Sequence, residues 1–327
     1  MDGKKTAVIL FQLGGPDSLN AVEPFLYNLF CDPDIFDFPL AFLFRKPLAR
    51  MISQMRARSV QHHYIVIGGK SPILELTRQQ AEALETELRK DIDAKVFVAM
   101  RYWHPKIDSV VENLKISNFD RFILLPLYPQ YSKPTTASSI NEWHRQCKKK
   151  KFNPPNEIVI KDFHQHPLYI EAIVGQINLT YNKFKNIPSK EIHLVFSAHG
   201  VPESLIASGD PYKDQIEKTV SAVISKGNWD SQHTLCYQSK VGPMKWLTPS
   251  LNDTINKLAG VGNRHLLVVP ISFVTEHIET LQEIDVQTRQ KATELGVKQF
   301  EMMPALNSHP KFIAALKDLV IKVIEKK

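Results

Sequence analysis

Short apolar runs alternate with amphipathic segments along the whole chain, and this alternation restricts the fold more than any other feature. Apolar runs of this length are typical of buried strands. Strands that alternate with helices form parallel sheets that carry helices on their faces. The expected strands lie at residues 6–13, 95–102, 121–128, 157–161, 192–197, 234–238, 265–271 and 297–302.

The segments between the strands predict helices, and the chain length predicts two domains. The expected helices lie at residues 18–30, 75–90, 106–116, 138–149, 168–184, 211–225, 248–258, 278–295 and 309–325. A chain of 327 residues suits two domains of about 150 residues each. The helix at 168–184 carries the chain across the middle, so we place the domains at 1–163 and 164–327. The expected fold class is therefore α/β, with two parallel sheets flanked by helices.

The composition is typical of a globular protein from a reducing compartment. Hydrophobic residues make up 43% of the chain and charged residues 23%. The three cysteines form no CxxC pair, which argues against a zinc or disulfide scaffold. Segment 6–13 ends in a glycine turn and is expected to be a strand rather than a signal peptide. No apolar run approaches the roughly 18 residues that a transmembrane helix needs, so we expect a cytoplasmic protein.

Neither the charge nor the glycine pattern indicates a nucleic acid or a nucleotide as ligand. The net charge of +7 is modest, and the tight basic run at 148–151 is typical of a solvated loop. The strand ends carry neither a GxGxxG fingerprint nor a GxxxxGKS phosphate loop. A nucleotide cofactor is therefore not expected.

Residues 268–283 form the stretch with the strongest chemical signal. The apolar run ends at Ser272, and a helix is expected to follow with Thr275 as its N-cap. Glu276, Glu279 and Glu283 then share one helical face, with His277 among them. Two interpretations stay open from spacing alone: a cation or proton site, or a solvated acidic first turn, which suits a helix N-terminus.

The carboxyl ends of the strands are expected to form one rim, where open α/β sheets bind ligands. The segments that follow the strands carry aromatic residues, arginine, histidine and carboxylate; they lie at 12–16, 100–105, 127–132, 197–200, 237–243 and 272–276. This combination suits a flat aromatic ligand that exchanges protons with a metal. For His199 the alternative is a satisfied histidine at a strand end.

The same segments identify a family. Residues 13–16 (LGGP), 196–202 (FSAHGVP), 238–247 (QSKVGPMKWL) and 270–280 (PISFVTEHIET) resemble those of ferrochelatase, which inserts ferrous iron into a porphyrin. Further matches lie at 67–73, 101–102 and 128–132. The order and spacing of seven segments agree, so the resemblance covers nearly the whole chain.

The resemblance implies two Rossmann-like domains with the porphyrin in a cleft between them. His199 matches the catalytic histidine, and Glu279 matches the acidic partner that faces it; either one is a candidate to meet the metal. Glu276 and His277 match residues that flank the acid and tune it or guide protons. Glu283 continues the acidic ridge by one turn, whereas position 287, a carboxylate in most relatives, is Gln287 here.

The resemblance also implies a set of porphyrin-binding residues. Arg101 and Tyr102 match a pair near the macrocycle, where Arg101 holds a propionate or supports the wall. For Trp246 and Phe273, core packing is the alternative. The full implied set is Leu13, Ser71, Arg101, Tyr102, Tyr128, Trp246 and Phe273.

Departures from the family pattern indicate the subtype. The coproporphyrin branch tends to carry a tyrosine near the first strand end, where this chain has Gln12 and Leu13, as in the protoporphyrin branch. Members with a [2Fe–2S] cluster use cysteines in a C-terminal extension, and this chain has no cysteine after Cys236. We therefore expect a protoporphyrin ferrochelatase with ferrous iron as substrate, no organic cofactor and no cluster. The alternatives are a coproporphyrin ferrochelatase, a tetrapyrrole-binding protein without catalysis and, more distantly, a dinucleotide-dependent enzyme.

Residues 35–52 are apolar, with Arg45, Lys46 and Arg50 close to the apolar side chains. The segment resembles the lip of the porphyrin cleft in the family. An apolar face with basic flanks predicts shallow contact with an anionic bilayer. The alternative is a helix that covers the sheet of the first domain. The sequence is compatible with a monomer or a homodimer.

Overall fold

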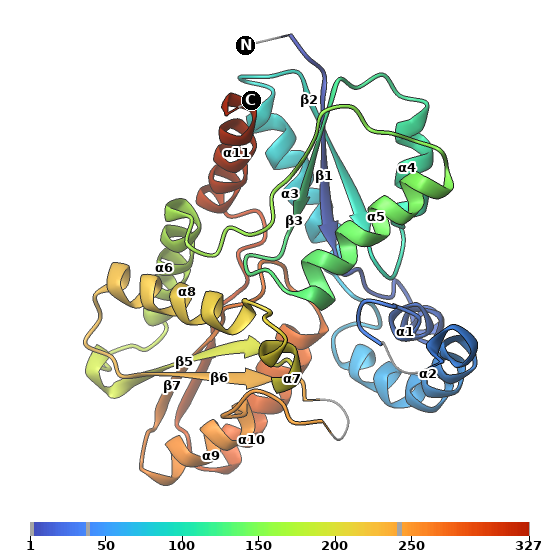
Figure 1. Cartoon of the computed structure of the whole chain (residues 1–327). Helices are drawn as coiled ribbons and strands as arrows, with labels where there is room; N and C mark the ends of the chain where they lie inside the picture. Colours follow the sequence, from blue (N-terminus) through green and yellow to red (C-terminus); the bar gives the residue numbers. More distant parts are fainter. Residues whose placement is uncertain (1–2, 37–39, 241–243, 327) are drawn as a thin grey trace. The chain divides into compact units, whose positions relative to one another are not determined.

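The structure is a computed structural model that describes residues 3–36, 40–240 and 244–326. It consists of two compact units (Figure 1). The first comprises residues 1–163 and 313–327, and the second comprises residues 164–312. We predicted that the second domain extends to residue 327, whereas helix α11 (Pro310–Glu325) lies mostly in the first unit. There Lys317 of α11 forms an ion pair with Asp91 at 2.5 Å.

Four parallel strands form the sheet of the first unit, in the order β2-β1-β3-β4. They are β1 (Thr6–Gln12), β2 (Ala94–Met100), β3 (Arg121–Pro126) and β4 (Glu157–Val159). Every residue of β1 is buried, and Ile9 lies beside Phe97 of β2 and Leu124 of β3. Helices cover a parallel sheet on both faces, which explains why β1 is a continuous apolar run.

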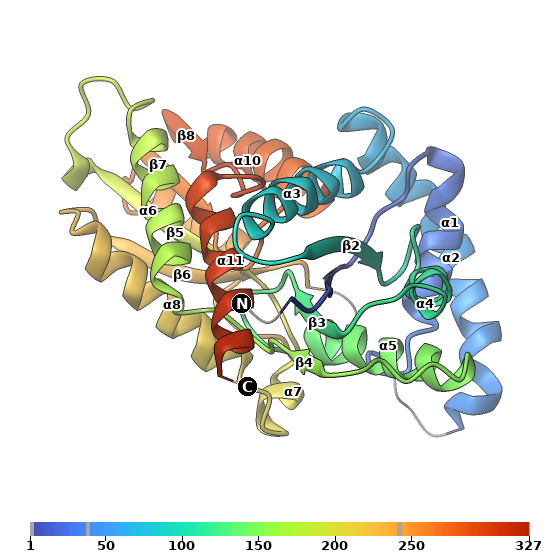
Figure 2. The same ribbon diagram turned by 90° about the horizontal axis from the view of Figure 1, so that it is seen from above.

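The helices of the first unit lie on both faces of this sheet and beyond one of its ends. Helices α4 (Ile107–Lys115) and α5 (Ser138–Lys149) pack on the face to which Ile9 belongs, through Val111 and Trp143. Helix α3 (Ile73–Leu88) covers the opposite face (Figure 2). Helices α1 (Val22–Phe30) and α2 (Ala41–Val66) pack against each other beyond the carboxyl ends of the strands (Figure 1).

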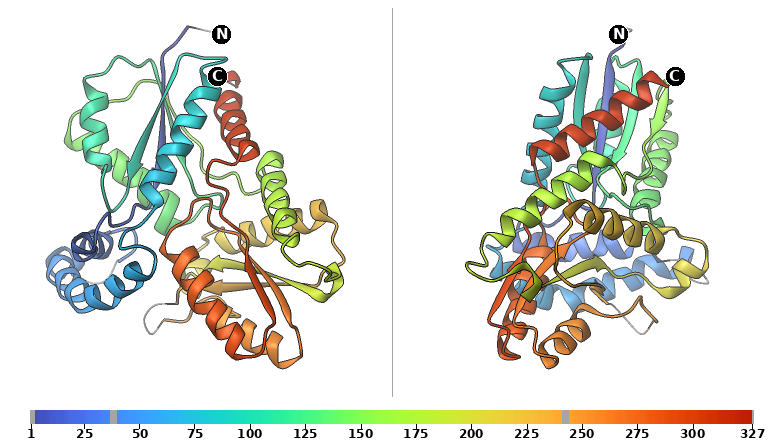
Figure 3. Two further views of the ribbon diagram at one scale, coloured as in Figure 1. Left: turned by 180° about the vertical axis from the view of Figure 1, so that it is seen from behind. Right: turned by 90° about the vertical axis from the view of Figure 1, so that its left-hand side faces the viewer.

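The second unit repeats the architecture, with parallel strands in the order β6-β5-β7-β8. The strands are β5 (Ile192–His199), β6 (His233–Gln238), β7 (His265–Pro270) and β8 (Gln299–Met302). Helices α9 (Leu251–Gly260) and α10 (Arg289–Glu294) pack on one face through Ile255 and Ala292. Helices α6 (Pro167–Tyr181) and α8 (Tyr212–Gly227) cover the other face (Figure 3). The remaining short elements are α7 (Glu203–Ala207), η1 (Leu19–Ala21), η2 (Lys133–Ala137) and η3 (Ser189–Glu191).

The expected helix at 278–295 differs from the prediction in two respects. It begins at Ile278, so Thr275 is not its N-cap. From Glu279 to Thr288 it is a π-helix (η4), which gives way to α10 at Arg289. π-Helical segments are rare and frequently mark functional sites.

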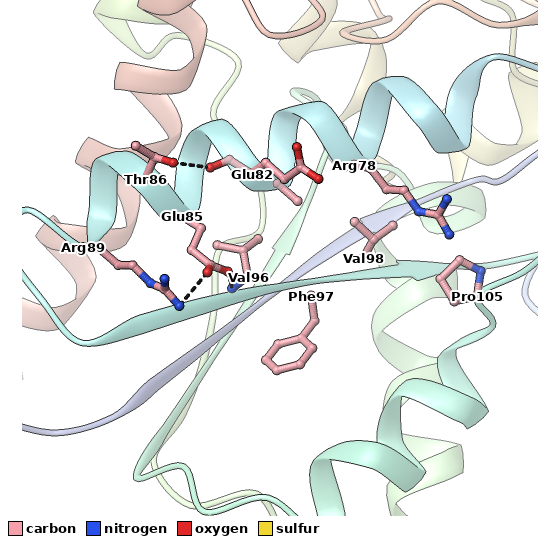
Figure 4. Close-up of a pocket in the computed structure, with 10 residues that line it drawn as sticks. Arg78, Glu82, Glu85, Thr86, Arg89, Val96, Phe97, Val98 and Pro105 are labelled. Atoms are coloured by element: carbon pink, nitrogen blue, oxygen red, sulfur yellow. Dashed lines mark hydrogen bonds and ion pairs between the residues drawn. The ribbon is translucent and has the colours of Figure 1, made fainter.

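A pocket of about 500 Å³ lies along the edge strand β2 and helix α3 (Figure 4). One side chain of α3 and one from the residue that follows it form hydrogen bonds with the main chain of the strand there. Glu85 accepts the Val96 N–H at 2.8 Å, and Arg89 donates to the Ala94 carbonyl at 3.1 Å. Glu85 and Arg89 also form an ion pair at 2.7 Å. These contacts occupy main-chain groups of the edge strand that could otherwise pair with a strand of another molecule. We therefore assign the polar groups that line the pocket a structural role.

Candidate functional site

The strand order of the second unit brings His199 and Glu279 together. β5 connects to β6 on one side and then to β7 on the other, so β5 and β7 flank the point at which the direction of winding changes. Ligands of open α/β sheets bind beyond the carboxyl ends of the strands at such a point. His199 is the last residue of β5, and Glu279 follows the loop that leaves β7. Their side chains meet, with His199 Nδ1 2.7 Å from Glu279 Oε2.

The two groups form a partly exposed ion pair. The His199 side chain is 36% exposed and that of Glu279 is 21% exposed. Burial alone would lower the pKa of His199, but the facing Glu279 carboxylate raises it above its ordinary value. Burial likewise opposes ionisation of Glu279, yet His199 lowers the pKa of that carboxyl to about 2. The pair therefore makes the imidazole a stronger base than an isolated histidine and keeps the negative charge on the carboxylate.

Ser239 joins Glu279 to a second carboxylate, Glu283. The Ser239 hydroxyl lies 2.5 Å from Glu283 Oε2 and 3.1 Å from Glu279 Oε2, and the Ser239 N–H donates to Glu283 Oε1 at 2.8 Å. Ser239 has a φ of 64°, a left-handed conformation that is uncommon outside glycine and asparagine. Burial first, and the charge of Glu279 second, raise the pKa of Glu283. An unbroken chain of polar atoms thus runs from His199 through Glu279 and Ser239 to Glu283.

One serine reaches both acids because they lie on the same side of one helix. The sequence-based prediction put Glu283 one α-helical turn deeper than Glu279. Residues four apart share a side in an α-helix and in the slightly wider π-helix alike. Glu279 and Glu283 are four apart, and both carboxylates contact Ser239. Gln287, a further four residues on, is exposed.

Main-chain contacts fix the position of His199. Its N–H donates to the Ser272 hydroxyl at 3.0 Å, and its carbonyl accepts from the Tyr212 hydroxyl at 3.0 Å. The next residue, Gly200, lies so close to its neighbours that a Cβ atom would be 2.7 Å from the Gln238 carbonyl and 3.2 Å from the Trp246 ring. Only glycine fits at such a close approach.

Aromatic side chains surround the two histidines. The Phe273 ring lies 6.3 Å from the His199 ring and 4.5 Å from the His277 ring. The half-buried Trp246 borders the site at Gly200, and its buried Nε1 has no hydrogen-bond partner among the described residues. Phe273 and Trp246 therefore both border the His199 side of the site. Residues 241–243 of the neighbouring motif lie outside the described part of the chain.

His277 is buried behind Phe273. Its Nδ1 lies 3.1 Å from the Thr275 carbonyl, and the residue is 6% exposed. Burial lowers the pKa of His277, although Glu279 and Glu276 both act in the opposite direction. The uncharged form of His277 is therefore favoured.

Glu276 does not share a face with the other two acids, contrary to the prediction. It precedes the helix and turns to the loop after β8, where its Oε1 accepts the Ala305 N–H at 2.7 Å. Its Oε2 accepts the Thr280 hydroxyl. The three-acid face predicted from α-helical spacing is therefore wrong, because residues 274–277 form a loop and only Glu279 and Glu283 lie on the helix.

The other predicted porphyrin-binding residues belong to the first unit. Arg101 and Tyr102 form a buried network with Asp32: the guanidinium makes an ion pair with Asp32 at 2.9 Å, and the Tyr102 hydroxyl donates to it at 2.5 Å. The Ser138 hydroxyl donates to the same carboxylate at 2.5 Å. The Arg101 side chain is only 9% exposed. Of the two predicted roles, this geometry favours support of the wall over capture of a propionate.

Leu13, Ser71 and Tyr128 lie at the carboxyl edge of the first sheet or beside it. The Leu13 carbonyl accepts the Tyr102 N–H at 3.0 Å. The Ser71 N–H donates to the Pro16 carbonyl at 2.8 Å. The buried Tyr128 hydroxyl has no hydrogen-bond partner among the described residues.

Three further residues of these networks escaped sequence reasoning. Ser239 is part of a quoted motif, but nothing in the sequence shows its left-handed backbone or its contact with two acids. Asp32 and Tyr212 carry no local signal, because each meets its partner only through the fold. A buried ion pair needs a partner for every charge, so Arg101 at a strand end was the one indication that an acid such as Asp32 exists.

The described ranges contain neither a cluster of metal ligands nor a membrane-spanning helix. In residues 3–36, 40–240 and 244–326, no group of three or more histidine, cysteine or acidic side chains is arranged to hold a metal ion. Within the same ranges, no helix combines the length and the apolarity required to cross a membrane.

Known proteins with the same fold include two whose structures are solved. SirB from Bacillus subtilis with Fe³⁺ aligns with 97% of this chain and 95% of its own length, with a TM-score of 0.57 and 12% identity. CbiX, the terminal enzyme for biosynthesis of siroheme in denitrifying bacteria, aligns with 98% of this chain and 99% of its own, with a TM-score of 0.53 and 12% identity. At such low identity these matches show the fold alone, which is that of two Rossmann-like units.

Sequence relatives are much closer. The family model named Ferrochelatase matches residues 5–324. The ferrochelatase of Aquifex aeolicus strain VF5 is 49% identical over 97% of this chain and 98% of its own length. That of Synechocystis sp. strain PCC 6803 is 44% identical over 97% of this chain and 82% of its own length. The chain therefore belongs to the ferrochelatase family, whose members insert a metal ion into a porphyrin.

Proposed function

We propose that this chain inserts Fe²⁺ into protoporphyrin IX to form protohaem, and that His199 and Glu279 carry the reaction. The observation that carries the proposal is the His199–Glu279 pair at the carboxyl edge of the second sheet, at 2.7 Å. The porphyrin must lose two pyrrole protons as the metal enters, so the site needs a base and a path that removes protons. The pair and the polar chain behind it supply both.

His199 is the proposed acceptor of the first pyrrole proton. Its Nδ1 is held by Glu279, and among the described residues Nε2 has no protein partner. A neutral imidazole with Nδ1–H on the carboxylate presents the Nε2 lone pair to the substrate. Glu279 then stabilises the imidazolium that forms, in the same way that it raises the pKa of His199.

Glu279, Ser239 and Glu283 are the proposed path for protons that leave the site. The Ser239 hydroxyl can donate to one carboxylate and accept from a protonated carboxyl on the other side. Glu283 suits the receiving end because its pKa is raised. Glu279 is also the proposed contact for ferrous iron, since a carboxylate oxygen and an imidazole nitrogen both bind this ion. His277, neutral and packed on Phe273, is proposed to tune the pair from behind.

The choice of protoporphyrin rests on the end of the first strand. Gln12 and Leu13 occupy the place where the coproporphyrin branch tends to carry a tyrosine. Coproporphyrin III has carboxylates at the positions where protoporphyrin IX has apolar vinyl groups, and the apolar Leu13 suits the latter. We propose that Leu13, Ser71, Arg101, Tyr102, Tyr128, Trp246 and Phe273 line or support the porphyrin site. The enzyme would need no organic cofactor and no iron–sulfur cluster, and would act as a monomer or homodimer.

A steady-state insertion assay with both porphyrins tests this function. Purified protein is supplied with Fe²⁺ under anaerobic conditions and with either protoporphyrin IX or coproporphyrin III, and haem formation is followed by absorbance. We expect kcat/KM to be clearly higher for protoporphyrin IX. A preference for coproporphyrin III would overturn the assignment of the branch, and porphyrin binding without turnover would identify a carrier protein instead.

We also propose that the start of helix α2 touches a membrane surface. Phe42, Leu43 and Phe44 are 79%, 57% and 54% exposed, which supports a lip over the alternative of a helix that covers the sheet. Arg45 and Lys46 follow at once and suit anionic lipid headgroups. Residues 37–39 of this lip lie outside the described part of the chain. The protein would then be cytoplasmic and peripherally bound, close to an apolar substrate that partitions into membranes.

Replacement of Phe42, Leu43 and Phe44 by serine tests the lip. We expect weaker binding to anionic liposomes and a higher apparent KM for protoporphyrin, with the iron dependence unchanged, because the apolar anchor is lost and the chemistry is not. The matched control replaces Ile116 and Val261, exposed by 86% and 70%, with serine. Liposome binding equal to that of the control would reject the lip, and unfolding of the triple variant would show that these side chains are needed for the core.

A further inference from the structure

Glu276 and Asn307 fasten two loops of the second unit to each other. Glu276 lies in the loop that follows β7, and Asn307 lies in the loop that follows β8. The Glu276 carboxylate accepts the Ala305 N–H at 2.7 Å, and the Asn307 side-chain oxygen accepts the Glu276 N–H at 3.1 Å. The Asn307 N–H donates in turn to the Val274 carbonyl at 2.8 Å. The loops are therefore joined by reciprocal side-chain and main-chain bonds.

The second oxygen of Glu276 extends this connection to the π-helix. It accepts the hydroxyl of Thr280, the residue directly after Glu279. The Thr280 hydroxyl oxygen also accepts the His277 N–H at 3.1 Å. Thr280 is completely buried and Glu276 is 9% exposed. One carboxylate thus holds the loop after β8 with one oxygen and the first turn of the π-helix with the other.

These contacts give Glu276 a task different from that of its acidic neighbours. A buried carboxylate is costly unless donors satisfy it, and the Ala305 N–H and the Thr280 hydroxyl do so on opposite sides. None of the bonds of its carboxylate in the described structure leads to His199, Glu279 or Glu283. The polar chain from His199 runs through Ser239 and bypasses Glu276.

We propose that Glu276 is a positioning residue, not part of the proton relay: it anchors the first turn of the π-helix so that Glu279 meets His199. The proposal rests on the proposed function for its activity readout. A shift of about 1 Å in a reacting group can cost roughly 10²-fold in rate. Loss of the anchor should therefore act on kcat, while the aromatic walls that bind the porphyrin keep KM nearly unchanged.

Comparison of Glu276→Gln with Glu276→Ala separates an anchor from a relay. The glutamine oxygen can accept the Ala305 N–H, and its amide can donate to the Thr280 hydroxyl, which then donates to the His277 carbonyl, 3.1 Å away. Glutamine cannot carry a proton at neutral pH. We expect Glu276→Ala to lower kcat by roughly 10-fold to 10²-fold, and Glu276→Gln to restore most of it with a pH–rate profile like that of wild type. An equal loss in both variants, or full activity of Glu276→Ala, would overturn the proposal.

Substitution of Asn307, the other side chain that joins the two loops, gives a second test of the anchor. Asn307 has a φ of 44°, so glycine removes its side chain without backbone strain, whereas alanine would add it. Asn307→Gly should lower kcat in the same direction, and combined with Glu276→Ala it should add little, because both changes break one connection. Additive losses in the double variant would count against a single anchor. Glu294→Gln, an exposed carboxylate on α10, serves as the matched control.

Hydrogen exchange keeps this test independent of the enzymatic activity. The amides of Glu276, His277 and Ala305 all donate to partners in the anchor. They should exchange faster in Glu276→Ala and at the wild-type rate in Glu276→Gln. If the wild-type protein does not insert iron but the two variants show these exchange rates, the proposed function is refuted and the anchor is supported. Unchanged exchange in Glu276→Ala would refute the anchor whatever the activity.

Discussion

Glu279→Gln is expected to reduce iron insertion to near the background rate while porphyrin binding persists. Glutamine preserves the size of the side chain and a hydrogen bond to His199 Nδ1, but it removes the negative charge. That charge raises the pKa of His199 and would stabilise the imidazolium formed when a pyrrole proton is taken up. It is also the proposed contact for the entering iron. The loss should appear in kcat, measured at saturating iron and porphyrin.

Two neighbouring positions make this prediction specific. Glu283→Gln should slow insertion by a smaller factor, because Glu283 lies at the far end of the polar chain and is joined to the Glu279 carboxylate through the Ser239 hydroxyl. Gln287→Glu should be tolerated, since the side chain is exposed. Porphyrin affinity, followed by fluorescence quenching, distinguishes lost chemistry from lost binding. If Glu279→Gln turned over at the wild-type rate, the His199–Glu279 pair would have a structural role and no part in the reaction.

His199→Ala is expected to lower kcat at least by the roughly 10²-fold that a general base typically contributes. No other described imidazole takes its place, because the His277 side chain is buried behind Phe273. Porphyrin should still bind, since its affinity would come mostly from aromatic and aliphatic contacts. Near-normal turnover of His199→Ala would exclude His199 as the base.

The pH dependence of the wild-type enzyme gives a second measure of His199. A base must be neutral to accept a proton, so kcat should fall as the pH drops through the pKa of His199. Because Glu279 raises this pKa, the fall should begin above the ordinary histidine value of about 6.5. In Glu279→Gln the residual activity should persist to lower pH, because burial still lowers the pKa of His199 while the larger opposing charge, that of Glu279, is gone and only the smaller effect of Glu283 remains. Identical profiles for the two proteins would contradict the coupling between His199 and Glu279.

Much of the fold could be predicted from the sequence because its determinants are local. The buried strands β1 and β7 are largely continuous apolar runs, and helices such as α4 and α9 show a clear helical periodicity of apolar residues. Parallel sheets demand this alternation, since each strand needs a helix to return the chain to the same edge. His199 and Glu279 could be named because family motifs mark the ends of β5 and β7, and strand ends are where α/β sheets bind ligands.

The tertiary structure decided what depends on contacts between distant segments. The spacing of residues 276, 279 and 283 suits an α-helix, yet Glu276 turns away because Ala305, 29 residues later, supplies its donor. The same contacts hold residues 274–277 out of the helix. Ser239, which follows β6, joins Glu279 and Glu283, and this contact forms only in the folded protein. In the sequence, Arg101 resembles a propionate ligand. In the structure, its guanidinium forms an ion pair with Asp32, which lies far from it in the chain. A side chain in a folded protein goes to the partner that satisfies it best, and only the fold determines which partners are within reach.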